Sequence, residues 1–298
     1  MKIGILHHEL EFAEKNIAEV LNEKGVETKL VDIRESNVEE ILKDCDLILN
    51  RVYASVANRD YPSIPKTLEL LKKLEKEGIK CINSYKTSLF DYNKYESFLE
   101  MKKNGIPNPE TILIENEENL EEKTKDLCEK LRLPMIIKRN IGGRGKDISR
   151  IESYEEALND LKNKFKNSKE EGYFGGFIAQ EFIKSSRNHD CRIGIINGKF
   201  EFSYSRSLIS LNSEDAWLAS CTKGSVEGIY NAEEPEKKIS LKASESIGSE
   251  FNELDIMFTE NGPVVIENNP TPNYFDEPED RKRIIQFTEI ILKKLNEK

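Results

Sequence analysis

Three oxygen-bearing side chains near the C-terminus could together hold a divalent cation: Asp255, Glu267 and Asn269. They belong to the stretch LDIMFTENGPVVIENNPTPN, in which Asn261-Gly262 is a strong signal for a hairpin turn between two short strands. Side chains alternate faces along a strand, so Glu267 and Asn269 share a face, and Asp255 joins them if the hairpin pairs in register. This all-oxygen set suits Mg²⁺ and is poor for zinc. The alternative is a plain hairpin whose polar side chains face water.

A glycine-rich loop indicates a second chemistry, the binding of phosphate. The segment NIGGRGKD follows a predicted strand that carries Lys138 at its end, and it precedes another predicted strand. In such a loop the backbone N–H groups around Gly142, Gly143 and Gly145 can fold over phosphates, with a lysine beneath. The spacing is neither a Walker A sequence nor GxGxxG, so a flexible hairpin loop is the alternative.

Two arginines lie on predicted strands of a second hairpin, which turns at Asn197-Gly198. These are Arg192 and Arg206, and Asp190 shares a face with Arg192 by the alternation of a strand. Exposed strand charges are the alternative interpretation of both arginines. A separate apolar strand, FIAQEFI, could offer backbone groups to a purine edge around its Gln180-Glu181 step.

Further candidates lie at or just beyond the carboxyl ends of predicted parallel strands, where ligands bind in doubly wound sheets: Arg51, Ser55 and Asn83. Arg51 could bind a carboxylate through two hydrogen bonds. A surface salt bridge is the alternative role for Arg51.

The elements that position these residues divide into three groups. The first alternates strands with amphipathic helices, which indicates a doubly wound parallel sheet, with strands at 2–7, 26–33, 46–52 and 79–82 and helices at 10–24, 38–43 and 64–77. After a predicted linker at 83–89, the second group has strands at 111–114, 134–139, 148–151 and 177–183 and helices at 91–103, 120–131 and 153–165. The third contains the two hairpins, a long aperiodic segment at 207–231, and helices at 235–252 and 280–295.

Composition excludes several classes of protein. The 298 residues carry a net charge of −10, which argues against a nucleic-acid-binding surface. No run approaches the roughly 20 apolar residues of a membrane span, and the N-terminus lacks the features of a signal peptide. The five cysteines are dispersed, as in reduced cytosolic proteins, so we predict a cytoplasmic location. The oligomeric state stays open, and a homo-oligomer is possible.

Together these segments resemble the ATP-grasp superfamily and, within it, the RimK-like carboxylate–amine ligases. The resemblance is collinear over nearly the whole chain and includes Asp91 with Lys94, IIKRNIGGRGKDI, AQEFI, HDCRIGIINGKFEFSYSR and LDI…VVIENNP. It implies an α/β (α+β) ATP-grasp fold, in which an N-terminal parallel sheet precedes two α+β subdomains that clamp ATP. The implied domains are 1–86, 87–184 with the glycine-rich lid, and 185–298 with the metal site.

The resemblance also implies roles for individual residues. Lys94 and Lys138 would bind nucleotide phosphates beneath the lid glycines, and Asp190 would lie near the ribose. The adenine would meet the backbone of Glu181 and Ile183, with Gln180 and Phe182 beside them. Two Mg²⁺ ions, for which Mn²⁺ could substitute, would bind Asp255, Glu267 and Asn269. Arg192 and Arg206 would contact the γ-phosphate and an acyl phosphate. The substrate side would be formed by Arg51, Ser55, Asn83 and Lys223.

The implied activity is ATP-dependent amide formation between a small-molecule or peptide carboxylate and an amino acid or amine, with release of ADP and phosphate. An inactive ATP-binding module and an ATP-grasp kinase are the alternatives. The sequence departs from the family pattern around the acceptor site. Segment 217–225 lacks the usual asparagine, Glu253-Leu254 replaces the usual glycine before the metal-binding aspartate, and residues 271–275 differ from the common small-residue and glycine tail.

Overall fold

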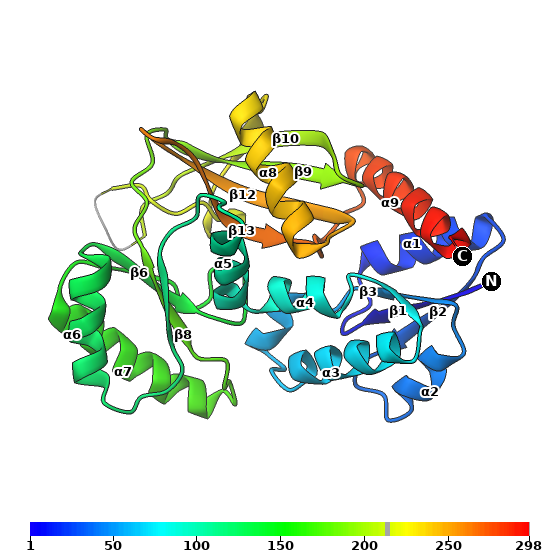
Figure 1. Ribbon diagram of the computed structural model, residues 1–298, viewed down its shortest axis with the longest axis horizontal. Coiled ribbons are helices and arrows are strands. Elements are labelled where there is room, and N and C mark those ends of the chain that lie inside the picture. Colours follow the sequence, from blue (N-terminus) through cyan, green and yellow to red (C-terminus); the bar gives the residue numbers. More distant parts are fainter. Residues whose placement is uncertain (212–214, 298) are drawn as a thin grey trace.

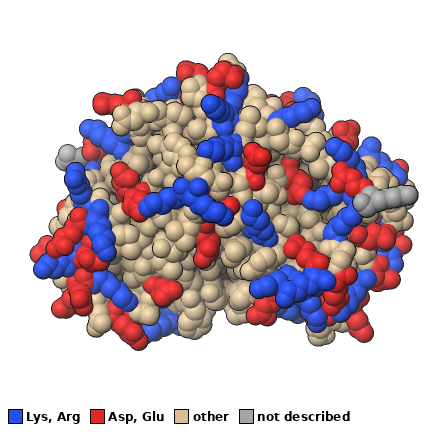
Figure 2. Space-filling model, in the orientation of Figure 1, with Lys and Arg blue, Asp and Glu red and all other residues tan. Residues whose placement is uncertain are grey.

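The computed structural model describes residues 1–211 and 215–297. In this part of the chain the strands form three sheets, each flanked by helices (Figure 1). Within the same residues, no helix combines the length and the apolar character needed to cross a bilayer. Figure 2 shows basic and acidic side chains interspersed over the visible face.

The N-terminal sheet is parallel and has the order β2-β1-β3-β4, which confirms the predicted doubly wound sheet. Its strands are β1 (Lys2–His7), β2 (Glu27–Asp32), β3 (Leu47–Asn50) and β4 (Lys80–Ile82), and its helices are α1 (Phe12–Glu23), α2 (Val38–Lys43) and α3 (Ser63–Lys76). Because strand side chains alternate, Ile3 and Ile5 pack on the side of α1, while Leu6 packs on the side of α2 and α3. The C-terminal helix α9 (Pro278–Asn296) lies beside α1 on the first of these faces (Figure 1).

The central sheet is antiparallel and has the order β5-β8-β6-β7. It consists of β5 (Thr111–Ile114), β8 (Phe177–Glu181), β6 (Met135–Arg139) and β7 (Ser149–Ile151), and one face is covered by α6 (Leu120–Leu131) and α7 (Tyr154–Glu170). Met135 and Ile137 of β6 join the core beneath these helices. Lys138 therefore points to the opposite face.

The C-terminal sheet has the order β11-β10-β9-β12-β13. Its strands are β9 (His189–Ile196), β10 (Lys199–Ser207), β11 (Glu227–Ile229), β12 (Phe251–Thr259) and β13 (Gly262–Asn269). Helix α8 (Glu234–Ile247) packs against apolar residues such as Ile193 and Leu254 on one face. The alternate residues, among them Arg192 and Asp255, lie on the other face.

Two predictions between the first and second sheets were wrong. The expected linker at 83–89 is mostly helix α4 (Tyr85–Tyr92), whose first turn is capped by Ser84 accepting a hydrogen bond from the Thr87 amide. The expected helix at 91–103 begins only at Lys94 as α5 (Lys94–Lys103), because Asn93 adopts an extended conformation and caps the new helix. The pattern Ser-x-x-Thr after a strand is the signal that could have revealed α4.

Two boundaries in the C-terminal region also differ from the prediction. Helix α8 ends at Ile247, since Gly248 adopts φ +70° and stops it, and Phe251 opens strand β12 instead of ending the helix. The β12–β13 turn consists of Glu260 and Asn261, one residue earlier than the predicted Asn-Gly pair.

Candidate active site

The β12–β13 hairpin brings the predicted metal ligands together. Asp255 pairs directly with Glu267, and Glu253 pairs with Asn269. A register shift between Asp255 and Ile256 brings Asp255 opposite Glu267, so the predicted face is shared although the turn and the regular pairing differ from the prediction. The Asn269 amide nitrogen Nδ2 donates to the Glu253 carbonyl at 3.0 Å. Its other amide atom, Oδ1, is therefore left to act as a ligand, and the hairpin presents carboxylate and amide oxygens on one face.

The two predicted arginines meet Asp255 from β9, which is next to β12, and from β10, one strand further away. Arg192 donates from Nε and Nη2 to the two carboxylate oxygens of Asp255 at 2.7 and 3.1 Å. Arg206 places Nη2 2.9 Å from Asp255 Oδ2 and donates to both oxygens of Asp190. Burial alone would raise the pKa of Asp255, but Arg192 and Arg206 hold it well below its usual range. Asp255 is thus an anion held rigidly between two cations.

The two predicted lysines approach the hairpin from the other side. Lys94, the first residue of α5, places Nζ 3.0 Å from Glu267 Oε1 and donates to the carbonyl of Gly142 at 2.6 Å. Burial lowers the pKa of Lys138 to about 8, although Glu267 nearby opposes this shift. Burial alone would raise the pKa of Glu267, but Lys94 and Lys138 hold it below its usual value. Three segments distant in the chain therefore meet at Glu267.

Between these groups lies a small pocket that includes a residue which sequence reasoning did not assign to the site. It is lined by Asp91, Lys94, Lys138, Gln180 and Glu267, among others. Asp91 is buried, its Oδ2 has no hydrogen-bond partner among the described residues, and burial raises its pKa to about 7. The one sequence signal for placing Asp91 in this pocket is its position three residues before Lys94.

The glycine-rich loop is held between the N-terminal and C-terminal regions. Asn58, at the end of the 3₁₀ turn Ala54–Asn58, donates from Nδ2 to the Gly143 carbonyl at 3.0 Å. Gly142 has φ +143°, and a Cβ there would lie 2.7 Å from Asn58 Oδ1, so only glycine fits. On the other side, a Cβ at Gly145 would lie 2.8 Å from Lys223 Cε.

Arg139 and Thr222 form further hydrogen bonds that hold the glycine-rich loop in place. Arg139 donates from Nε to Asp147 Oδ2 at 2.6 Å, which joins the two ends of the loop. Thr222 donates to the Arg144 carbonyl at 3.4 Å. Ser55, predicted on the substrate side, is buried with its Cβ 3.2 Å from where a Cβ of Gly143 would stand. Ser55 and Lys223 therefore both lie against lid glycines.

Arg51 and Asn83 are buried and form hydrogen bonds within the protein, so their side chains do not face a substrate cleft. Arg51 is only 2% exposed, and its guanidinium donates to Glu14 Oε1 at 3.0 Å and to the Pro272 carbonyl at 2.8 Å. Asn83 is fully buried and donates to the Asn50 carbonyl at 3.0 Å. Both predictions of ligand binding need correction, because these side chains join the N-terminal sheet to the segment after β13.

The predicted adenine-binding segment leaves the central sheet after Glu181, two residues before the predicted strand end. The Glu181 amide donates to the Glu110 carbonyl at 2.8 Å, so this amide is already satisfied. Phe182 packs near Ile136 and Trp217, with the Arg150 guanidinium 4.5 Å from its ring centre. Phe182 and Ile183 follow the end of β8, and Gln180 donates to Thr111 at 3.0 Å.

Comparisons with known proteins agree with this architecture. Residues 91–288 match the RimK-like ATP-grasp domain. The chain is similar to β-citrylglutamate synthase B of Mus musculus, with 24% identity over 199 residues, which are 67% of this chain and 48% of that protein. It thus spans about half the length of that relative. The similarity to a probable α-L-glutamate ligase of Cellvibrio japonicus is 22% identity and covers 91% of this chain and 88% of that one.

A solved structure shares the fold over almost the full length. The D-cycloserine synthetase DcsG superposes with a TM-score of 0.76 and 13% sequence identity, covering 99% of this chain and all of that one. The predicted fold, a parallel N-terminal sheet followed by two antiparallel sheets with helices, is confirmed.

Proposed function

The chain belongs to the RimK-like ATP-grasp family, and from this premise we propose that it is an ATP-dependent carboxylate–amine ligase. The proposed reaction joins a small-molecule or peptide carboxylate to an amino acid or amine and releases ADP and phosphate. The observation that carries the proposal is the meeting of Lys94 with both Glu267, at 3.0 Å, and the lid carbonyl of Gly142, at 2.6 Å.

The chemistry explains why such a site needs cations and a lid. A carboxylate is a poor electrophile, because its oxygen is a poor leaving group. Transfer of the γ-phosphoryl group of ATP to the carboxylate gives an acyl phosphate, and attack by the amine then expels phosphate. Lys94, Lys138 and the lid amides would bind the nucleotide phosphates, while Arg192 and Arg206 would stabilise charge on the transferred group. The lid would keep water from the acyl phosphate.

Magnesium fits the residues of the β12–β13 hairpin. Asp255, Glu267 and Asn269 provide two carboxylates and an amide whose nitrogen is already engaged, which leaves a hard oxygen set. Among the described residues, no group of three or more His, Cys, Asp or Glu side chains forms a metal cluster, in keeping with a site completed by an amide and by phosphate oxygens. We propose two Mg²⁺ ions, for which Mn²⁺ can substitute. Bound magnesium would neutralise phosphate charge.

The test is ADP release measured with a matrix of candidate acids and amines. Glu267→Gln removes one negative charge from the metal-binding set, and we expect turnover to fall by about 100-fold or more. The matched control is Glu260→Gln, the same substitution at an exposed position in the turn of the same hairpin. Unchanged ADP release in Glu267→Gln would contradict the proposal.

The same assay distinguishes the alternatives. Tight binding of Mg-ATP without turnover for any pair would indicate a nucleotide-binding module, and a phosphorylated product without an amide would indicate a kinase. We further propose a cytoplasmic location, supported by the five free cysteines.

A further inference from the structure

Glu253 is a carboxylate in a buried position of the metal-binding hairpin. It lies two residues before Asp255 and on the same face of β12. The side chain is 95% buried. Within the described residues, its carboxylate forms one ion pair, with Arg192 Nη1 at 3.5 Å, which is too long for a hydrogen bond.

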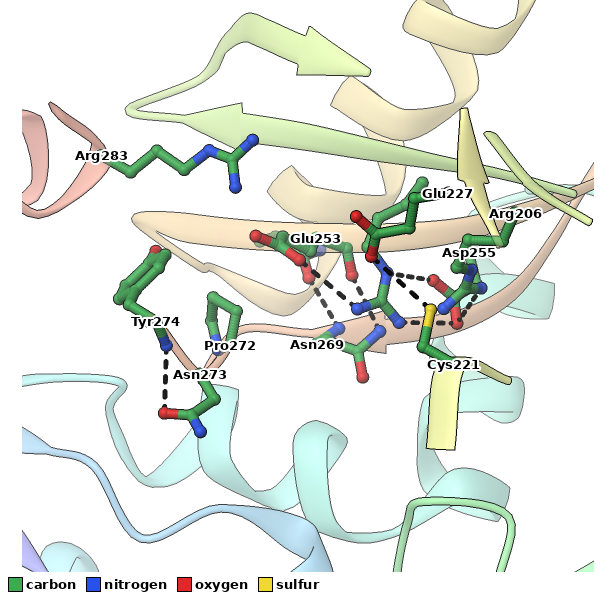
Figure 3. Close-up of polar contacts among 12 residues, drawn as sticks. Arg206, Cys221, Glu227, Glu253, Asp255, Asn269, Pro272, Asn273, Tyr274 and Arg283 are labelled. Carbon is green, nitrogen blue, oxygen red and sulfur yellow. Dashed lines mark hydrogen bonds and ion pairs between the residues drawn. The ribbon is translucent and has the colours of Figure 1, made fainter. Parts of the chain in front are cut away.

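Arg192 cannot neutralise Glu253 fully, because Asp255 already holds its Nε and Nη2 atoms. The surrounding charges repeat this imbalance. Arg206 and Arg283 lie on or beside this face (Figure 3), and Arg192 reaches Asp255 and Glu253 there. Asp255 pairs with Arg192, Asp190 with Arg206 and Asp280 with Arg283, and Asp255 is also a proposed magnesium ligand. Glu253 and Glu227 are two further carboxylates beside these pairs.

Arg283 does not correct the imbalance, because it is engaged elsewhere. Its Nη1 lies 2.8 Å from Asp280 Oδ1, and its guanidinium stacks 3.7 Å from the centre of the Phe202 ring. Glu227, opposite Arg206 in the β10–β11 pairing, is exposed and contacts the Cys221 thiol at 3.5 Å. Glu253 thus shares Arg192 with Asp255 and has no hydrogen-bonded cation within the described part of the chain, while Glu227 is exposed to solvent.

A second, independent observation points to a ligand at this place. The Tyr274 side chain is 99% buried, and its hydroxyl has no hydrogen-bond partner among the described residues. Figure 3 shows this hydroxyl directed to the side of the hairpin where the Glu253 carboxylate lies. Burying a hydroxyl or a carboxylate without hydrogen bonds is costly, so such groups in a native structure require an explanation.

We propose that Glu253 and Tyr274 recognise a positively charged group on the amine acceptor, and that this acceptor is a diamine or a basic amino acid. The inference rests on the proposed function and names the acceptor class of that reaction. An ammonium group has three donors, which the Glu253 carboxylate and the Tyr274 oxygen can accept. An acceptor with an additional carboxylate, such as glutamate, would meet the excess negative charge of Glu253 and Glu227 and would be disfavoured.

The test is calorimetric titration of the wild-type protein, saturated with Mg²⁺ and the non-hydrolysable nucleotide AMP-PNP, with 1,4-diaminobutane, L-lysine and L-glutamate. We expect the diamine and lysine to bind about ten-fold or more tightly than glutamate. Glu253→Gln should weaken diamine binding by about ten-fold or more, because a charge-assisted hydrogen bond is lost. The matched control Glu260→Gln should bind like the wild type. Tyr274→Phe should weaken the diamine by a smaller factor.

The outcomes separate this inference from the proposed function. If the wild type fails to bind Mg-AMP-PNP, the proposed function falls and the inference falls with it. If nucleotide binds but glutamate binds as well as the diamine, or Glu253→Gln leaves diamine affinity within two-fold, the inference alone is overturned. Should Glu253→Gln fail to fold, the preference of the wild type among the three ligands still decides.

Discussion

The two sides of the β12–β13 hairpin differ in the balance of charge that they present. On the nucleotide side, two lysines, Lys94 and Lys138, face Glu267 and the buried Asp91, whose pKa burial raises to about 7. On the acceptor side, the guanidinium groups of Arg192 and Arg206 are outnumbered by the carboxylates of Asp190, Glu253 and Asp255. The two sets meet at one hairpin, where Asp255 pairs directly with Glu267.

Because of this difference, one hairpin can bind two ligands of opposite charge, a triphosphate and a cationic acceptor. An excess of cations suits a triphosphate, whereas an excess of carboxylates suits a cationic acceptor. Strand alternation places the groups on a common face, and the neighbouring elements then decide which charges they meet: α5 and β6 supply the lysines, and β9 and β10 supply the arginines. Three predictions test whether the two sides differ in this way.

The largest effect is expected on the acceptor side. Arg206→Met removes the hydrogen-bond donor to both oxygens of the buried Asp190 and one of the two cations at Asp255. Breaking one partner of a buried ion pair leaves an uncompensated charge, so the free energy of unfolding should fall by about 3–5 kcal/mol. Urea denaturation measures this change.

The control for that prediction is the double variant Asp190→Asn with Arg206→Met. Removing both partners of the pair avoids the uncompensated Asp190 charge, so part of the lost stability should return. Equal stability of the wild type and Arg206→Met would show that these arginines do not balance the acceptor-side carboxylates.

An intermediate effect is expected on the nucleotide side and depends on pH. Burial lowers the pKa of Lys138 to about 8, so in the free protein its ammonium is present below pH 8 and is lost as the pH rises through 8. Affinity for Mg-AMP-PNP should therefore be full below pH 8 and fall by up to about ten-fold between pH 8 and 9. Lys138→Arg should flatten this profile, since arginine keeps its charge. Identical pH profiles of both proteins would exclude Lys138 as the titrating group.

The smallest effect concerns the lid, which both sides share. Asn58→Ala removes the hydrogen bond from Nδ2 to the Gly143 carbonyl and leaves the lysines and arginines in place. We expect a loss of about 1 kcal/mol in the closed state of the lid, seen as a KM for ATP raised several-fold with little change in acceptor affinity. A change in acceptor affinity with no change in the KM for ATP would show that Asn58 acts on the acceptor side and not on the nucleotide side.

Local patterns predicted much of this molecule. Strand alternation sufficed to put Glu267 and Asn269 on one face, because side-chain parity is a property of a few successive residues. Asp255 joins them through a register shift between Asp255 and Ile256, which the sequence did not indicate. The alternation of apolar strands and amphipathic helices likewise predicted the parallel N-terminal sheet. The Ser84 cap and the extended Asn93 were missed, since their helices are short and the apolar periodicity runs across the break.

Local sequence was enough to predict which residues of one strand share a face, where the flexible glycines lie and which superfamily the chain resembles. The partners of each charged side chain became known only from the folded structure. Arg51 was predicted to face a ligand, but its partner is the Pro272 carbonyl, 221 residues away. The binding role proposed for Glu253 depends on its ion pair with Arg192, on a neighbouring strand, and on the position of Tyr274. Electrostatic roles depend on distance and burial in space, and neither quantity is encoded in local spacing.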